Sequence, residues 1–158
     1  MKRLTGRNDS TDQAADDERR AGARPFADSL ARLKEVGLRP TRQRLALAKL
    51  LFDAGDHHIT AEQLHAAARS AGVKVSLATV YNTLHQFKDV GILREVVVEP
   101  GRSYFDTNVR PHHHFFHEGR GHLTDIPDEA VALTRLPDPP EGAEISRVDV
   151  IIRVNDRA

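Results

Sequence analysis

The chain contains no cysteine and no tryptophan in its 158 residues. The absence of cysteine excludes disulfide bonds, thiolate zinc sites and cysteine nucleophiles. There is no apolar leader, and no apolar run approaches the roughly eighteen residues of a membrane span. We therefore expect a cytoplasmic protein without a membrane partner. Lys and Arg together number 23, as do Asp and Glu. With a formal net charge of zero, only local charge clusters can indicate nucleic-acid binding.

The pattern along the chain changes twice within residues 1–108. Residues 1–24 are charged and nearly free of large apolar side chains, so we expect a disordered tail. Apolar side chains then recur at helical spacing in four segments: 26–36, 42–54, 60–71 and 76–90. Thr60 and Gln63 form a capping box at the start of the third segment. The period next becomes that of strands, at 92–100 and 102–108, on either side of a Pro-Gly turn. Helices followed by a hairpin are typical of a winged helix.

The remainder of the chain predicts a second, smaller unit. Short strands are expected over 112–116 and 122–126, a short helix near 128–136, and a last strand over 144–154. The fold class is therefore predicted to be α+β. Its parts are a tail at 1–24, a winged-helix DNA-binding domain at 25–107 and a small α/β domain at 108–158.

The predicted helix over 76–90 has a polar face that could contact DNA. Opposite its apolar stripe lie short hydrogen-bonding side chains suited to phosphates and base edges: Ser76, Thr79, Asn82, Thr83 and Gln86. Three arginines, Arg39, Arg42 and Arg44, cluster where an earlier helix begins, and Arg102 lies at the tip of the hairpin. Polar helix faces are more often only solvated. The DNA-binding hypothesis therefore depends on helices, hairpin and arginines occurring together in this order.

Five of the nine histidines lie within the stretch "FDTNVRPHHHFFHEGRGHLTD". On a strand, His112 and His114 point to one face and His113 to the other. Asp106 and Asp125 flank this run at the ends of neighbouring strands, and His57 and His58 both precede the third helix. Nitrogen and oxygen donors without sulfur suit Mn²⁺, Fe²⁺ or Zn²⁺. Because protons compete for imidazole, metal binding should weaken below a pH of about 6.5.

The same residues leave two other interpretations open. His112, His114 and Asp125 could hold a metal-bound water in a hydrolase. Such a site needs an open coordination position and a general base, and the sequence shows no obvious base. A metal-storage module is the other alternative, but it would give the helices and hairpin no purpose.

Four stretches of the chain resemble the ferric uptake regulator (Fur) superfamily. They are "LRPTRQRLALAKLL", "HHITAEQL", "VSLATVYNTLHQFKDVGIL" and "SYFDTN…HHHFFHEGRGHLTDIP". The resemblance implies a metal-responsive transcription factor that binds promoter DNA as a homodimer and is not an enzyme. It implies an N-terminal winged helix and a C-terminal α/β dimerisation domain, and leaves open whether dimers form tetramers. Tyr81, followed by Asn82, corresponds to the recognition-helix tyrosine, and Arg39 to the basic residue before the second helix.

The resemblance also implies a regulatory metal site. Its ligands would be His58 from the DNA-binding lobe and four from the second lobe: Asp106, His112, His114 and Asp125. Most members hold a structural zinc in two Cys-x-x-Cys pairs, of which the first falls here on His117 and Arg120. We therefore expect no structural zinc of this four-cysteine type. The dimer would then depend on apolar side chains of the last strand: Ile145, Val148, Val150, Ile152 and Val154.

The histidine run and the missing cysteines further resemble the iron response regulator (Irr) branch. That branch implies haem ligation by His112, His113 and His114, with Phe115 and Phe116 packing on the porphyrin, and release or inactivation of the regulator by haem. Two alternatives within regulation remain. One is a direct Fe²⁺ or Mn²⁺ sensor whose metal-bound form binds DNA, and the other is a peroxide sensor.

Overall fold

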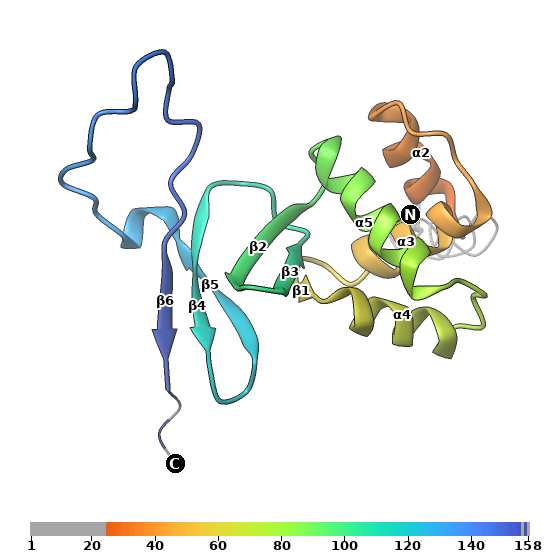
Figure 1. Ribbon diagram of the computed structural model, residues 1–158. Helices are drawn as coiled ribbons and strands as arrows, with labels where there is room; N and C mark the ends of the chain where they lie inside the picture. Colours follow the sequence, from red (N-terminus) through yellow and green to blue (C-terminus); the bar gives the residue numbers. More distant parts are fainter. Residues whose placement is uncertain (1–24, 156, 158) are drawn as a thin grey trace, which may run out of the picture.

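The computed structural model describes residues 25–155 and 157, so the predicted tail at 1–24 lies outside the described residues. Helices occupy one end of the molecule, at the right of Figure 1. They are α2 (Ala27–Glu35), α3 (Arg42–Phe52), α4 (Ala61–Ser70) and α5 (Leu77–Asp89). All four match the helices predicted from apolar spacing. Thr41, Thr60 and Ser76 cap α3, α4 and α5 by accepting a hydrogen bond from a first-turn N–H.

The helices enclose one apolar core. Its largest fully buried side chains are Leu33, Leu47, Leu51, Leu64, Leu84, Phe87 and Phe105. Phe105 lies on a strand, so the hairpin closes this helical core. Thr83, predicted on the polar face of α5, is instead buried, at 4 % exposed. The prediction was wrong there because Thr83 borders the apolar stripe, next to Leu84.

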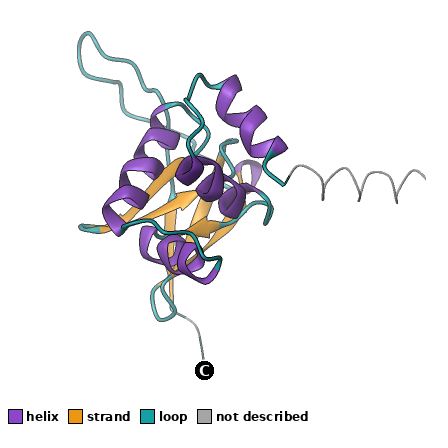
Figure 2. Ribbon diagram, turned by 90° about the vertical axis from the view of Figure 1, so that its right-hand side faces the viewer, coloured by secondary structure: helices purple, strands orange, loops and turns teal. Residues whose placement is uncertain are grey.

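The strands form two three-stranded sheets. They lie behind the helices in the view of Figure 2. The first has the order β1-β3-β2, from β1 (His58–Ile59), β3 (Arg102–Asp106) and β2 (Arg94–Glu99), all antiparallel. The second has the order β5-β4-β6, from β5 (His122–Pro127), β4 (His112–His117) and β6 (Ile151–Val154), with β6 parallel to β4. The first sheet lies between the helices and the second sheet (Figure 1).

A second, smaller core joins the two sheets. It is formed by Val96, Val98, Tyr104, Phe116 and Leu123, with Ile151 packed against them. The hairpin therefore contributes one face to each core: Phe105 points to the helices and Tyr104 to the second sheet. This arrangement confirms the predicted α+β class, with helices and hairpin in the order expected of a winged helix.

The C-terminal part differs from its prediction at two places. The helix expected near 128–136 is only a 3-10 turn at Asp128–Ala130, and the strand expected over 144–154 is shortened to Ile151–Val154. The intervening residues run as the long loop at the upper left of Figure 1. Three prolines, at 137, 139 and 140, oppose regular structure there. Among the described residues, no helix is long and apolar enough to cross a membrane.

Candidate metal centre

Five donor side chains converge where the two sheets meet. Each sheet contributes a pair of residues that face each other directly. His58 on β1 is the register partner of Asp106 on β3, and His114 on β4 is the register partner of Asp125 on β5. His112 precedes His114 by two residues and therefore points to the same face of β4. One donor atom from each of the five residues lies within 4.8 Å of all the others.

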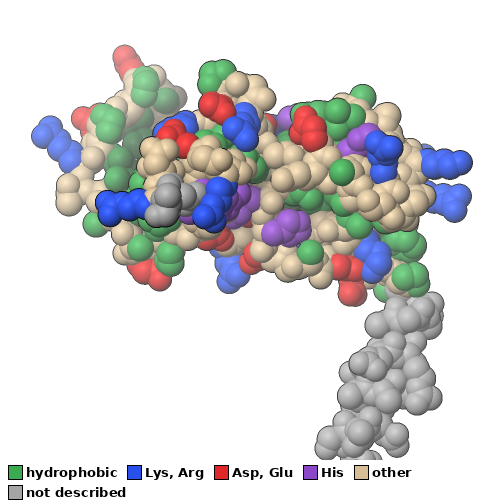
Figure 3. All heavy atoms as spheres, turned by 90° about the horizontal axis from the view of Figure 1, so that it is seen from below, with side chains coloured by type: hydrophobic (Ala, Val, Ile, Leu, Met, Phe, Trp, Pro, Cys, Tyr) green, Lys and Arg blue, Asp and Glu red, His purple; other side chains and the backbone are tan. Residues whose placement is uncertain are grey.

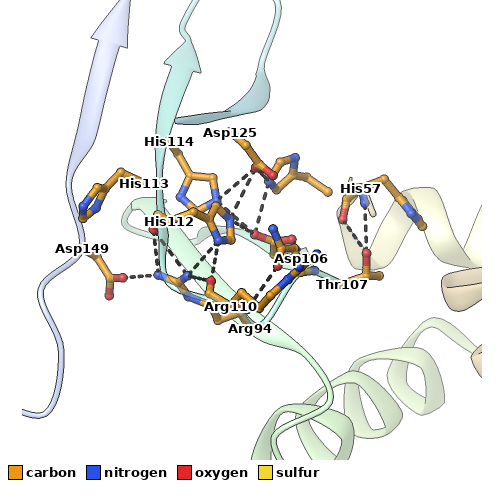
Figure 4. Close-up of polar contacts among 12 residues, drawn as sticks. His57, Arg94, Asp106, Thr107, Arg110, His112, His113, His114, Asp125 and Asp149 are labelled. Carbon is orange, nitrogen blue, oxygen red and sulfur yellow. Dashed lines mark hydrogen bonds and ion pairs between the residues drawn. The ribbon is translucent and has the colours of Figure 1, made fainter. Parts of the chain in front are cut away.

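The individual distances show how the donors group. Asp106 Oδ2 accepts hydrogen bonds from His112 Nε2 at 2.7 Å and His114 Nε2 at 3.0 Å. Its other oxygen, Oδ1, accepts the backbone N–H of Asn108 at 2.8 Å. Asp125 Oδ1 lies 2.8 Å from His58 Nε2 and 3.4 Å from His112 Nε2. Figure 4 shows His112 and His114 directed toward Asp106 and Asp125.

This donor set fits a divalent cation. Donors on opposite sides of an ion at about 2.1 Å are about 4.2 Å apart, so the observed cluster needs only small inward shifts. The buried Nε2 of His58 makes no hydrogen bond although Asp125 Oδ1 lies 2.8 Å away, and a cation at the centre of the cluster would give this nitrogen a partner. Three imidazoles and two carboxylates suit Mn²⁺, Fe²⁺ or Zn²⁺. The carboxylates would neutralise the charge of one such ion.

Electrostatics within the cluster follow from burial and mutual contact. Burial alone would raise the pKa of Asp106, which is fully buried. Hydrogen bonding from His114, the close imidazole of His58 and the backbone N–H of Asn108 outweigh burial and hold this pKa well below its ordinary value. Burial likewise would lower the pKa of His58, but Asp106 and Asp125 outweigh it and raise this pKa. The cluster thus keeps a charged carboxylate buried among imidazoles.

His57 and His113 lie outside the cluster. The ring of His57 contacts the Gly55 carbonyl through Nδ1 at 2.8 Å. His113 points to the opposite face of β4, toward β6 (Figure 4), where its Nδ1 accepts the backbone N–H of Val150 at 3.2 Å. Its Nε2 lies 3.2 Å from Asp128 Oδ1. The alternation expected along the strand is therefore confirmed, and His58 rather than its neighbour reaches the site.

The structure adds partners that the sequence did not single out. Arg94, at the start of β2, is buried and contacts the backbone around His112. Its other partner is Asp149, just before β6. Asn108 and Thr107 fix the turn after Asp106 through hydrogen bonds to Asp106 and to the His57 backbone. Arg94 carried no recognisable signal, because its role depends on residues that lie 16 to 55 positions away.

The predicted DNA-contacting residues fall into two groups. Those with exposed side chains are Arg39, Arg42, Ser76, Tyr81, Asn82 and Arg102. Arg44 is instead half-buried, and its guanidinium donates to Gln86 Oε1 at 2.8 and 3.1 Å and to the Arg39 carbonyl at 2.8 Å. Thr79 is also half-buried, with its hydroxyl 2.9 Å from that of Ser76. Lys and Arg side chains project from the helical end in Figure 3.

Two exposed members of the first group have partners within the chain. The Tyr81 hydroxyl donates to Glu62 Oε1 at 2.7 Å. This hydrogen bond raises the pKa of Tyr81 and lowers that of Glu62. The Arg102 guanidinium donates to Glu99 at 3.1 Å and lies 5.8 Å from the ring centroid of Phe116, against the second sheet. Figure 3 shows histidines near the middle of the molecule, between the helical and sheet ends.

The protein therefore has two parts, a helical domain with the first sheet and a second sheet beside it. The His/Asp cluster, a candidate metal site, lies where these parts meet. The profile of the ferric uptake regulator family matches residues 35–150, and the chain belongs to this family. The peroxide-responsive repressor PerR of Staphylococcus aureus is 36 % identical over 99 residues. That alignment covers 63 % of this chain, and the chain spans only 66 % of the relative's length.

Solved structures share the fold over most of the chain. The ferric uptake regulator of Vibrio cholerae superposes with a TM-score of 0.63 at 26 % identity, covering 80 % of this chain and 98 % of that one. The Pseudomonas aeruginosa ferric uptake regulator, solved with manganese, has a TM-score of 0.62 at 24 % identity and covers 82 % of this chain and 98 % of that one. The family match thus stands on residues 35–150, and the solved structures share the fold, but neither comparison shows the iron response regulator branch that the histidine run suggested.

Proposed function

We propose that the protein is a metal-responsive transcriptional regulator that binds duplex promoter DNA as a homodimer. In this proposal a divalent cation held by His58, Asp106, His112, His114 and Asp125 controls DNA binding. The observation that carries the proposal is the convergence of five donors from two sheets within 4.8 Å of one another. Family membership favours this function over the hydrolase and storage alternatives.

The position of His58 supports the link between metal and DNA. His58 lies two residues before Thr60, which caps α4 with a reciprocal pair of hydrogen bonds to Gln63. A displacement of His58 would therefore move the capped start of α4 with it. Donors shared between β1 and β4 would fix the helical domain relative to the second sheet. In a dimer held by the second sheets, this angle would set the spacing of the two recognition helices.

The DNA-facing surface is assigned by exposure and charge. We propose that Arg39 and Arg42 contact phosphates, and that Ser76, Thr79, Tyr81 and Asn82 of α5 and its cap approach the groove. Arg44 would act indirectly, because its guanidinium already ties α3 to Gln86 of α5. Arg102 would have to leave Glu99 and the Phe116 ring to reach a backbone phosphate.

The homodimer is proposed on the exposed apolar side chains near the C-terminus. Leu133, Leu136, Ile145 and Ile152 are 48 %, 45 %, 46 % and 39 % exposed in the single chain. Large apolar side chains gathered in one segment are typical of an interface. Sedimentation equilibrium should give a dimer, and a second association step would indicate the tetramer.

The test begins by recovering DNA ligands without assuming an operator. A library of random duplexes is selected on the Mn²⁺-loaded protein, and the recovered duplex is titrated by fluorescence anisotropy. Four forms are compared: metal-free protein, Mn²⁺ form, Fe²⁺ form and haem-treated protein. The proposal expects tight, salt-sensitive binding only with a divalent ion. Equal binding by the metal-free protein and the metal-bound forms would contradict it.

Haem is a second candidate effector, supported by the consecutive histidines. His112, His113 and His114 are only 5 %, 5 % and 1 % exposed, so their ligation of haem requires β4 to separate from its neighbours. Such a separation would remove two of the five donors and lower DNA affinity. In the anisotropy experiment this candidate expects haem to release DNA from the metal-bound protein. A His113→Ala variant, which keeps all five donors, should then respond less to haem.

Peroxide sensing is a third candidate, supported by the name of the Staphylococcus aureus relative. An Fe²⁺-loaded site would direct hydrogen peroxide to its own imidazoles. One oxygen atom would be inserted into a ring carbon of His58, His112 or His114, and one water would leave. Mass spectrometry should find one added oxygen on these histidines in the Fe²⁺ form and none in the Mn²⁺ form. An unmodified Fe²⁺ form would count against this candidate.

A further inference from the structure

Arg94 is a buried arginine, only 6 % exposed, at the start of the hairpin strand β2. Its guanidinium reaches out of the first sheet toward the strand that carries two of the five donors. Nη1 donates to the Arg110 carbonyl at 3.3 Å, and Nη2 donates to the His112 carbonyl at 3.4 Å. A second contact of Nη2 is an ion pair with Asp149. One side chain thus joins β2, the start of β4 and the segment that leads into β6.

From these contacts we infer that Arg94 is a positioning residue for the metal centre, acting through His112. The inference rests on the proposed metal site. A histidine that ligates through Nε2 carries its proton on Nδ1 and needs an acceptor for it. The acceptor here is the Arg110 carbonyl, 2.7 Å from His112 Nδ1. Arg94 donates to that same carbonyl and thereby fixes the group that selects the ring's tautomer and orientation.

The guanidinium of Arg94 also lies beside the His112 ring itself. Nη1 lies 3.3 Å from His112 Nδ1. With Nδ1 protonated, both atoms are donors, and the Arg110 carbonyl accepts from both. The His112 carbonyl also accepts from the guanidinium, so the backbone on both sides of the ring is held by one planar group. The imidazole therefore presents Nε2 toward Asp106 without freedom to rotate away.

Stability alone does not explain Arg94. Its Nε is buried without a hydrogen-bond partner, which carries a desolvation cost. An apolar side chain of similar volume in such a place is often as stable as a buried ion pair, or more so. Asp149, its anionic partner, also accepts from Arg147 at 2.8 Å, and the next residue, Val150, donates to His113. Arg94 therefore ties the ligand strand to the C-terminal segment as well as to the hairpin.

The test compares Arg94→Gln with the matched control Arg153→Gln. Arg153 also joins the hairpin to the C-terminal segment, through the Val98 carbonyl and Glu118, but these contacts do not include a donor residue. Two quantities are measured: Co²⁺ affinity from visible absorption, and the His112 tautomer of the Zn²⁺-loaded protein from nitrogen-15 NMR. Arg94→Gln should weaken Co²⁺ binding about 10- to 100-fold, the usual effect of losing a partner of a metal ligand. It should also replace a single Nδ1–H tautomer by a mixture.

Arg153→Gln should keep Co²⁺ affinity within about threefold and leave the tautomer unchanged, because sites without shared partners act independently. Wild-type affinity and spectrum in Arg94→Gln would overturn the positioning role alone, as would an equal loss in Arg153→Gln. Absence of Co²⁺ binding by the wild-type protein would overturn the metal proposal and the role of Arg94 with it. If Arg94→Gln does not fold, Arg94→Lys replaces it in the test, because Lys keeps the positive charge but lacks the planar guanidinium with its several donors. It should still give mixed tautomers, and an unchanged tautomer would contradict the inference.

Discussion

Divalent cations should stabilise the folded protein, and His58 should contribute to this effect while its neighbour His57 does not. A ligand that binds one site of the folded state, at about 100 times its dissociation constant, adds about 2.7 kcal/mol to the free energy of unfolding. For a chain of this length, each kcal/mol raises Tm by about 2–4 °C. The expected increase with Mn²⁺ is therefore about 5–11 °C.

The His58→Ala variant removes one of the five donors, the one supplied by β1. Losing a partner of a metal ligand costs about 10- to 100-fold in affinity, and losing a ligand should cost at least as much. At the same Mn²⁺ concentration the stabilisation then falls to about 0.4–1.4 kcal/mol or less. Tm should therefore increase by at most about half as much as in the wild-type protein.

Thermal unfolding followed by circular dichroism, with and without Mn²⁺, measures both quantities. His57→Ala is the matched control, because its ring contacts the Gly55 carbonyl instead of the donor cluster. It should show the full wild-type increase. The reasoning would be refuted by equal increases in His58→Ala and the wild-type protein, or by an equal loss in His57→Ala.

Three further predictions concern the helical domain. Thr60→Ala removes the acceptor of a 3.1 Å hydrogen bond at the start of α4 and should cost about 1 kcal/mol in urea unfolding, whereas an unchanged midpoint would argue against the cap. Because the hydrogen bond from Tyr81 lowers the pKa of Glu62, the carboxylate should titrate below its ordinary value in carbon-13 NMR. In Tyr81→Phe this pKa should rise toward that value, and an unmoved titration would contradict the contact. Arg42→Ala should weaken binding to all duplexes alike and reduce the salt slope by about 1, whereas an unaltered slope would remove Arg42 from the phosphate contacts.

The helices of the helical domain could be predicted because apolar spacing and helix caps are patterns of residues close together in the sequence. Apolar spacing identified α2 to α5, and Thr41, Thr60 and Ser76 cap their helices as polar side chains before an apolar run predict. The alternation of strand side chains also placed His112 and His114 on one face of β4. Thr83 marks the limit of this reasoning, because a residue at the edge of an apolar stripe can lie on either side of the boundary.

The C-terminal segment was predicted less well. The Ile- and Val-rich pattern over 144–154 indicates a strand, but a strand forms only where a neighbour supplies hydrogen bonds. In the described chain that neighbour is β4, which pairs from Ile151 onward. The apolar pattern of residues 128–136 likewise gives only one 3-10 turn, at Asp128–Ala130. Local pattern therefore identified apolar residues without determining their partners.

The donor set shows what the sequence reveals about the candidate site. Residue types and strand alternation indicated a nitrogen–oxygen site, but the choice of His58 over His57 came only from the family resemblance. That resemblance grouped Asp106 with the second lobe, whereas the structure pairs it with His58 in the first sheet. Arg94 had no signal at all, since an arginine at the start of a strand gives no indication of burial. Its contacts arise only when the two sheets pack together.

The convergence of the five donors can be tested most directly by anomalous diffraction from crystals of the Mn²⁺-loaded protein. The account predicts one strong manganese peak, within bonding distance of His58, Asp106, His112, His114 and Asp125, where the two sheets meet. A manganese peak elsewhere, or one that His58 does not reach, would contradict it.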